Sequence, residues 1–198
     1  MVIGITGGIA TGKSAFAAGL CASLPSATVF DADRSARELT DRDPEAQALI
    51  RQTFGPEIYS PGGDLNRAML RTIVFADPEK RRALEQILHP RIRRQWTREA
   101  ESRRESSELF LADIPLLYET GGEAFCDRVV VVACTARVQL ERLMARSSLA
   151  EAAAEQMIAA QMPLREKIAR ADHIIWNNGP LSALHAQTEV FARAWATF

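Results

Sequence analysis

The chain has 198 residues, of which 47% are hydrophobic and 25% charged, and its net charge is −1 at pH 7. These values are ordinary for a globular enzyme with one sizeable core and a small appended subdomain, and they carry no overall nucleic-acid signature. No apolar run approaches the ~20 residues that span a bilayer, and no signal segment precedes the first strand. We therefore expect a cytoplasmic protein, a monomer or weak oligomer, with neither membrane nor nucleic-acid partners.

Five short runs of apolar and β-branched residues predict the strands of the fold. They are nearly continuous in hydrophobic character rather than alternating, which is typical of strands buried on both faces of a parallel sheet. The runs are VIGIT at 2–6, ATVFD at 27–31, LFLADIP at 109–115, RVVVVA at 128–133 and HIIWN at 173–177.

Helical patterns separate these runs, and cap residues indicate where several helices begin. Asp43 followed by Pro44 predicts the start of a helix that ends at Gly55. Asp77 followed by Pro78 predicts the start of another helix in the same way. Thr135 is a predicted N-cap, Ser148 with Glu151 is a predicted capping box, and a last amphipathic helix covers about 181–196. The three cysteines show no paired spacing and predict reduced thiols.

The alternation of strands and helices predicts a doubly wound α/β sheet. The segment 32–108 is far longer than one crossover helix requires, so it predicts an all-helical insertion, and 138–168 predicts a smaller helical excursion. The predicted core is therefore 1–31, 109–137 and 169–198. Both insertions follow the carboxyl ends of strands, the side where open α/β sheets bind ligands.

The loop after the first strand carries the spacing of a phosphate-binding loop, Gly7-x-x-x-x-Gly12-Lys13-Ser14. Its backbone N–H groups and the following helix N-terminus present donors to phosphate oxygens. Lys13 is expected to bridge the β- and γ-phosphates, and the Ser14 hydroxyl to ligate Mg²⁺. The motif predicts a nucleoside triphosphate as donor and leaves the acceptor open.

Asp31 and Asp33 lie at the carboxyl end of the second predicted strand. A carboxylate there can accept a proton from an attacking hydroxyl, while Asp33 also stands where an N-cap would stand. The two interpretations are compatible, since one aspartate can cap while the other acts.

The insertion is locally basic, with eleven Lys and Arg against five Asp and Glu between Arg67 and Arg104. An anionic, phosphate-bearing acceptor would suit this surface, although a charged helix face exposed to solvent gives the same pattern. His89-Pro90 is interpreted as a break between two helices. Arg142 and Arg146 share one helical face, as expected for a lid that closes over ATP, or for solvent-exposed side chains.

Taken together, these motifs resemble the dephospho-CoA kinase family over nearly the whole length. The segments TGGIATGKS, DADRSARELT, LHPRIR, DIPLLYE, QLERLMAR, QMPLREK and NNG carry the resemblance. It implies an α/β P-loop NTPase fold of the adenylate-kinase type, with a five-stranded parallel sheet, a helical CoA-binding insertion at 32–108 and a lid at 138–168. It also implies ATP-dependent phosphorylation of the ribose 3′-hydroxyl of dephospho-CoA.

The resemblance also implies roles for the matched positions. Asp33 is the expected base, with Lys13 and Arg142 completing the catalytic set. The acceptor residues implied alongside Asp33 are Leu116 and Leu117, and the resemblance implies substrate-binding or lid-hinge roles for His89, Arg91, Gln161 and Lys167. The ATP-binding residues implied are Gly8, Ile9, Ala10, Thr11, Gly12, Lys13, Ser14, Ala15, Arg142 and Asn177.

The chain departs from the family pattern at Ala10, Met157 and Trp176, where glycine, arginine and an acidic residue are usual. Two other functions share the phosphate loop. A nucleoside or nucleotide kinase would differ in the insertion that selects the acceptor. A non-enzymatic nucleotide switch would carry an Asn-Lys-x-Asp guanine motif, which the sequence does not contain.

Overall fold

The computed structural model describes residues 1–104 and 108–195, which form two compact units. The sheet unit comprises Met1–Asp31 and Glu99–Phe198, and the helical unit comprises Ala32–Arg98. The predicted bounds of a core, a CoA-binding insertion and a lid stay predictions.

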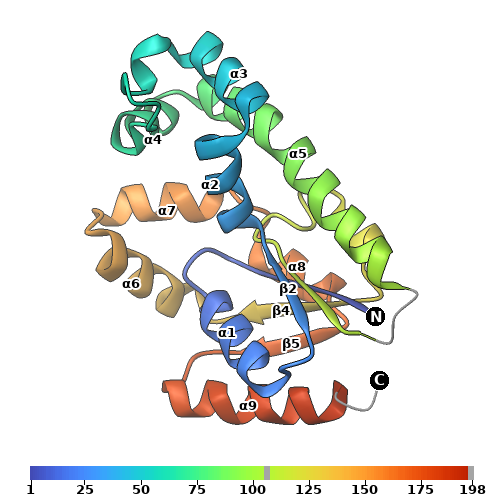
Figure 1. Cartoon of the computed structure of the whole chain (residues 1–198). Helices are drawn as coiled ribbons and strands as arrows, with labels where there is room; N and C mark the ends of the chain where they lie inside the picture. Colours follow the sequence, from blue (N-terminus) through green and yellow to red (C-terminus); the bar gives the residue numbers. More distant parts are fainter. Residues whose placement is uncertain (105–107, 196–198) are drawn as a thin grey trace. The chain divides into compact units, whose positions relative to one another are not determined.

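Within the described residues, the sheet unit holds one sheet of five strands (Figure 1). The strands are β1 (Val2–Gly7), β2 (Thr28–Asp31), β3 (Phe110–Asp113), β4 (Arg128–Ala133) and β5 (His173–Trp176). All neighbours pair in parallel in the order β2-β3-β1-β4-β5, so the predicted α/β fold with a five-stranded parallel sheet is confirmed. The chain leaves β1 toward one side of the sheet and later returns to its other side. The carboxyl end of β1 is therefore the topological switch point, where sheets of this kind bind ligands.

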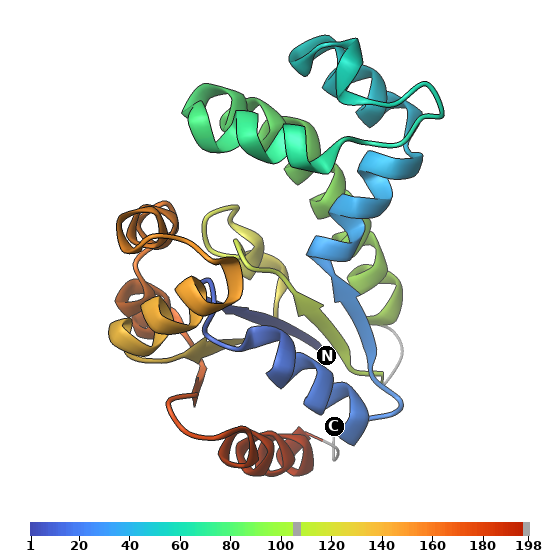
Figure 2. The same ribbon diagram turned by 90° about the vertical axis from the view of Figure 1, so that its left-hand side faces the viewer.

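Helices α1 (Lys13–Ser23) and α9 (Leu181–Trp195) cover the same face of this sheet, as Figure 2 shows. Alternate strand residues such as Ile5, Val130 and Ile175 point into the core between this face and the helices. Phe16 and Phe191 pack edge to face there, with ring centroids 5.7 Å apart. Each fully buried side chain of this size contributes about 1.5–3 kcal/mol, so this packing holds α1 and α9 against the sheet.

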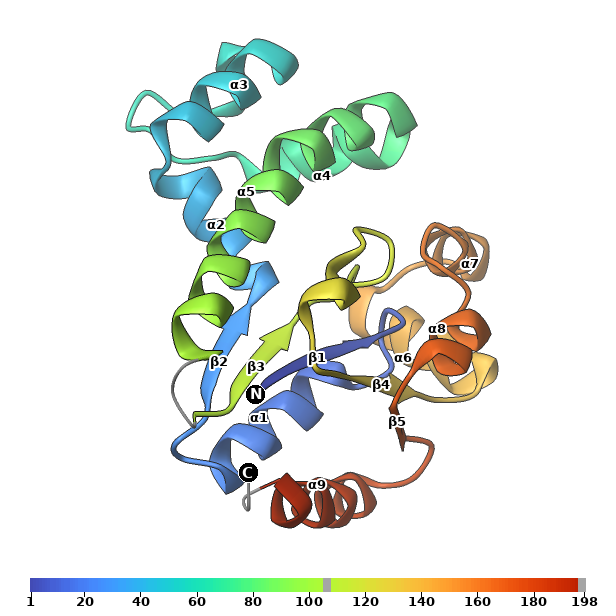
Figure 3. The same cartoon turned by 90° about the vertical axis from the view of Figure 1, so that its right-hand side faces the viewer.

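The carboxyl-terminal half of the sheet unit contains α6 (Ala136–Ser147), α7 (Glu151–Ala159) and α8 (Leu164–Arg170) (Figure 3). A short 3-10 helix, η2 (Gly122–Phe125), lies between β3 and β4. The backbone N–H of Val138 donates to Thr135 Oγ1 at 3.4 Å, so Thr135 caps α6 as predicted. No described helix is long and apolar enough to cross a membrane.

The helical unit contains α2 (Ala32–Arg42), α3 (Pro44–Phe54), a 3-10 turn (Pro56–Ile58), α4 (Arg67–Ala76) and most of α5 (Pro78–Arg104). Its core gathers Ile50, Phe54, Ile58 and Leu70 among other buried side chains. Asp43 caps α3 as predicted, because its Oδ1 accepts from the backbone N–H of Ala46 at 2.8 Å.

Two local predictions are wrong. Ser148 does not begin a capping box; it ends α6 in the left-handed conformation at φ 50°, and α7 begins at Glu151 without a side-chain cap. The helix does not break at His89-Pro90 either, because α5 runs through Pro90 to Arg104. Ile87 before the proline and Trp96 after it are both buried, and this packing on either side of Pro90 outweighs the one backbone hydrogen bond that proline removes.

Candidate active site

The loop between β1 and α1 is shaped as a phosphate cradle. Gly12 adopts φ 96°, and a Cβ there would lie 2.1 Å from the Asn177 amide nitrogen, so only glycine fits. Ala10 adopts φ 60°, which places a non-glycine residue in the left-handed region at a position where the resemblance favours glycine. The first turn of α1 leaves the N–H groups of Lys13 and Ser14 without helical carbonyl partners, as anion binding requires.

Lys13 Nζ forms an ion pair with Asp113 at the carboxyl end of β3. Their side chains are 11% and 7% exposed, so the pair is nearly withdrawn from solvent. In the sheet register Asp113 lies opposite Ile5 on one side and Asp31 on the other. The Asp113 carboxylate therefore lies beside the phosphate loop at the end of the neighbouring strand. The sequence prediction missed Asp113, although a carboxylate that ends an apolar strand was the available signal.

Two glutamine side chains, one on α6 and one in the segment after α7, form hydrogen bonds with the backbone of the phosphate loop. The Ile9 N–H donates to Gln161 Oε1 at 2.9 Å, and Gln139 Nε2 donates to the Ile9 carbonyl at 2.9 Å. Gln161 thus contacts the phosphate loop, and its role in acceptor binding stays a prediction. Gln139 is a further residue that the sequence did not single out.

Two predicted ATP residues meet at the other end of the loop. Asn177, which follows β5, donates through Nδ2 to the Thr11 carbonyl at 2.9 Å. Arg142 on α6 donates through Nη1 to the Asn177 carbonyl at 2.9 Å. The structure thus joins the loop, α6 and the end of β5 by direct hydrogen bonds.

Lys167 on α8 is fully buried. Its ammonium lies 2.9 Å from Glu119 Oε1 and donates to the carbonyls of Pro115 and Gly7, at 2.9 and 3.3 Å. Burial lowers the pKa of this ammonium, an effect that Glu119 opposes by hydrogen bonding and by charge. The role of Lys167 in acceptor binding stays a prediction.

The two leucines predicted to line the acceptor site differ in their exposure to solvent. Leu117 is fully buried, with its Cδ2 atom 2.7 Å from where a Cβ on Gly4 would lie, so it packs inside the sheet unit. Leu116 is partly exposed and remains accessible to a ligand.

The helical unit carries the remaining predicted residues. Asp33 is exposed in the first turn of α2, two residues after β2 ends. Arg91 is engaged within its own unit, since it donates to the Ile87 carbonyl at 2.9 Å and lies 3.5 Å from Glu45. His89 is half-buried on α5.

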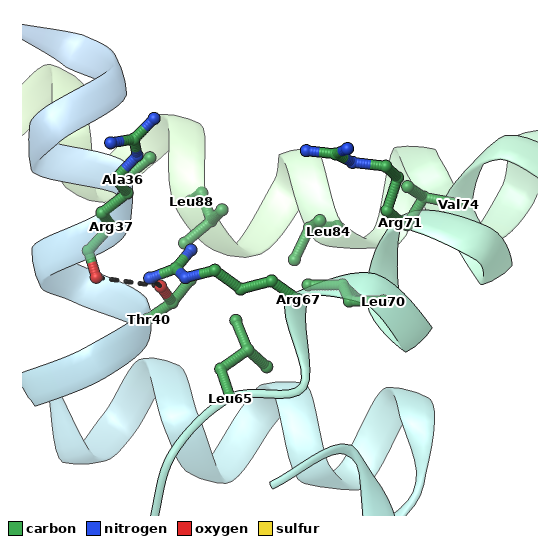
Figure 4. A pocket seen from close by; sticks show the side chains of 10 residues that line it. All are labelled: Ala36, Arg37, Thr40, Leu65, Arg67, Leu70, Arg71, Val74, Leu84 and Leu88. Atoms are coloured by element: carbon green, nitrogen blue, oxygen red, sulfur yellow. Dashed lines mark hydrogen bonds between the residues drawn. The ribbon is translucent and has the colours of Figure 1, made fainter. Parts of the chain in front are cut away.

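A pocket of about 430 Å³ lies within the helical unit (Figure 4). Figure 4 shows Arg37, Arg67 and Arg71 around a floor of aliphatic side chains. The floor comprises Leu65, Leu70, Val74, Leu84 and Leu88. Arg67 pairs with Asp41 at 2.8 Å, whereas the guanidinium groups of Arg37 and Arg71 have no ion-pair partner among the residues described. Cations above apolar surface suit a ligand with both anionic and aliphatic parts.

The sheet order, the phosphate cradle at the switch point and the Lys13–Asp113 pair define a P-loop kinase of the α/β class. Comparisons with known proteins narrow this class. A family model described as dephospho-CoA kinase matches residues 1–183. The dephospho-CoA kinase of Symbiobacterium thermophilum is 46% identical over 98% of this chain and 80% of its own, and that of Anaeromyxobacter dehalogenans is 48% identical over 95% and 89%. The crystal structure of TT1252 from Thermus thermophilus is 36% identical, with a TM-score of 0.74 over 98% of this chain and 97% of that one. The chain belongs to the dephospho-CoA kinase family, as the sequence motifs predicted.

Proposed function

We propose that the protein transfers the γ-phosphoryl group of ATP to the ribose 3′-hydroxyl of dephospho-CoA, releasing ADP and coenzyme A. The observation that carries this function is that a chain matching the family model over residues 1–183 retains the complete phosphate loop in binding geometry. The roles of individual residues given next are part of the proposal.

On the donor side, the backbone of residues 8–15 surrounds the ATP phosphates, and Lys13 turns from Asp113 toward the β- and γ-phosphates. Asn177 and Arg142 border the nucleotide, and Arg142 stabilises the charge that develops on the transferred group. Ser14 and Asp113 fit a magnesium site, because Mg²⁺ takes only one or two protein oxygens and completes its shell with phosphates and water. When bound, Mg²⁺ would neutralise phosphate charge.

On the acceptor side, Asp33 accepts the proton of the 3′-hydroxyl as the oxygen attacks the γ-phosphorus. One O–P bond forms, the bond between the γ-phosphorus and the bridging oxygen breaks, and ADP leaves. Asp33 is exposed in the first turn of α2, so a hydroxyl group can reach its carboxylate oxygens.

The pocket of the helical unit suits the remainder of the acceptor. Dephospho-CoA carries a diphosphate joined to an aliphatic pantetheine chain with a geminal dimethyl group. We propose that the guanidinium groups of Arg37 and Arg71 bind the diphosphate and that the aliphatic floor contacts the pantetheine chain.

The test offers the purified protein ATP and Mg²⁺ with dephospho-CoA, with adenosine, with AMP or with no acceptor. We expect ADP release that depends on dephospho-CoA, and a product heavier by one phosphate. A dephospho-CoA analogue that lacks the 3′-hydroxyl is the matched control and should give no product. Equal ADP release without acceptor, or faster phosphorylation of AMP or adenosine, would contradict the proposal.

A further inference from the structure

Lys167 contacts three residues in two segments at the phosphate loop. Gly7 ends β1 and begins the loop, while Pro115 and Glu119 lie in the segment after β3. The ammonium of Lys167 reaches all three, through two backbone carbonyls and one carboxylate. One buried side chain on α8 therefore connects two segments that are more than one hundred residues apart in sequence.

The contacts of Lys167 leave no hydrogen-bonding capacity for a ligand. A lysine ammonium has three N–H donors and no acceptor. Glu119 Oε1, the Pro115 carbonyl and the Gly7 carbonyl provide three acceptors, at 2.9, 2.9 and 3.3 Å. Because the side chain is fully buried, donation to a substrate would require giving up one of these contacts in a place that water does not reach.

Two of the bonded groups lie next to the atoms that act on phosphate. Pro115 follows Asp113, the partner of Lys13, by two residues, and its carbonyl also accepts from Thr6 Oγ1 at 3.0 Å. Glu119 Oε1 accepts in addition from the Met162 N–H at 3.0 Å, beside Gln161 on the phosphate loop. The network thus reaches the loop at Gly7 directly and at Ile9 through Gln161.

We infer that Lys167 is a positioning residue for phosphoryl transfer, which fixes the start of the phosphate loop relative to the Asp113 strand end without touching either substrate. This inference rests on the proposed function and goes beyond it by assigning Lys167, Glu119 and Gln161 to one supporting network. The network sets the separation of Lys13 and Asp113 through the backbone, and misplacement of catalytic groups by about 1 Å can lower a rate roughly 10²-fold.

The test compares Lys167→Met, which keeps most of the length of the side chain and removes the charge and the three N–H donors, with the wild-type protein. We expect kcat to fall roughly 10²-fold while the KM values for ATP and dephospho-CoA change by no more than about threefold, because Lys167 contacts neither ligand. Rates are measured well below the melting temperature of each variant, and far-ultraviolet circular dichroism checks folding.

Leu184→Ala is the matched control. Leu184 is buried on α9 in the core that contains Phe16, outside the network, so its truncation lowers the melting temperature and leaves kcat within about twofold of wild type. If Lys167→Met loses no more kcat than Leu184→Ala, or if it raises a KM instead of lowering kcat, the positioning role is wrong.

If Lys167→Met does not fold, Glu119→Gln tests the positioning role instead. Its amide oxygen can still accept from Lys167 and Met162, and only the charge is lost, so we expect kcat to fall roughly tenfold with both KM values retained. An unchanged kcat in this variant would overturn the inference. A wild-type protein without turnover that depends on dephospho-CoA would instead refute the proposed function, so the two failures are distinguishable.

Discussion

A lysine of the sheet unit and two arginines of the helical unit differ in burial and in hydrogen-bonding partners. In the sheet unit, Lys167 is fully buried and its three donors are taken by acceptors of the protein. In the helical unit, Arg37 and Arg71 are exposed at a pocket with an aliphatic floor, and neither guanidinium has an ion-pair partner among the residues described. A saturated, buried cation positions its neighbours, whereas an exposed and unpaired cation can exchange water for a ligand phosphate.

Because of this difference, we expect substitutions in the two regions to change different kinetic constants. Substitutions in the network around Lys167 should lower kcat, because they move groups that act on the transferred phosphate. Substitutions in the pocket should raise the KM for dephospho-CoA, because they remove binding that is the same in the ground state and the transition state. The following predictions test this division, beginning with the largest expected effect.

Lys13→Ala should lower kcat roughly 10³-fold, since it removes the cation that bridges the β- and γ-phosphates and leaves Asp113 without its ion-pair partner. Steady-state ADP release measures the loss. Asp113→Asn is the companion variant and should bind ATP at least as well when Mg²⁺ is omitted, because Lys13 no longer has a competing carboxylate. Retention of near-normal kcat in Lys13→Ala would exclude the phosphate loop from the chemistry.

Asp33→Asn should lower kcat roughly 10²-fold and leave nucleotide binding unchanged, because the amide keeps the shape of the side chain and cannot accept the proton. Calorimetric binding of ADP with Mg²⁺ and steady-state turnover separate the two effects. Asp31→Asn is the control for a nearby carboxylate at the end of β2. Although Asp33 belongs to the helical unit, as the pocket arginines do, its substitution should affect kcat rather than KM. A near-normal rate would remove Asp33 from the role of base.

Arg71→Gln and Arg37→Gln should each raise the KM for dephospho-CoA about tenfold with little change in kcat, as expected when one charge-assisted hydrogen bond to a phosphate is lost. Arg34→Gln is the matched control on α2, because Arg34 pairs with Glu38 at 2.9 Å and does not line the pocket. Initial rates at varied dephospho-CoA and saturating ATP measure the effect. Equal KM values in all three variants would remove the pocket from acceptor binding.

Tyr118→Phe should leave activity nearly unchanged and raise the free energy of unfolding by about 1 kcal/mol at pH 7. The Tyr118 hydroxyl is buried and has no hydrogen-bond partner in the described part of the chain, so its removal relieves a desolvation penalty. Unlike Lys167, Tyr118 is therefore a buried polar group without acceptors.

The pH dependence of unfolding gives Tyr118 a second signature. Burial raises the pKa of Tyr118 from 10 to about 12, with the charge of Arg170 opposing the shift. Between these values the unfolded chain loses the phenolic proton while the folded protein keeps it, so stability falls as pH rises. Wild type should lose up to about 2 kcal/mol more than Tyr118→Phe over this range, measured by denaturant unfolding. Parallel stability curves for the two proteins would contradict this account.

Features that depend on near neighbours in sequence could be predicted well. The five parallel strands, the phosphate loop and the Asp43 and Thr135 caps follow from residues at most a few positions apart. Of the two errors, only the one at Pro90 arose where tertiary packing overrode a local signal, because Ser148 is exposed. Ser148 carries a capping pattern but ends the previous helix, and Pro90 lies within a helix that is packed on both sides.

The sequence by itself determined the phosphate loop, the strands that flank it and membership of the dephospho-CoA kinase family. Only the tertiary structure decided what the charged side chains contact. Lys167 and Gly7 are 160 positions apart, and Lys13 and Asp113 are 100 apart. Such pairs leave no periodic pattern along the chain, because they form only when the sheet order brings β1 beside β3 and α8 against β4. For this reason no motif in the sequence shows that Lys167 is fully buried and bonded to the carbonyls of Gly7 and Pro115.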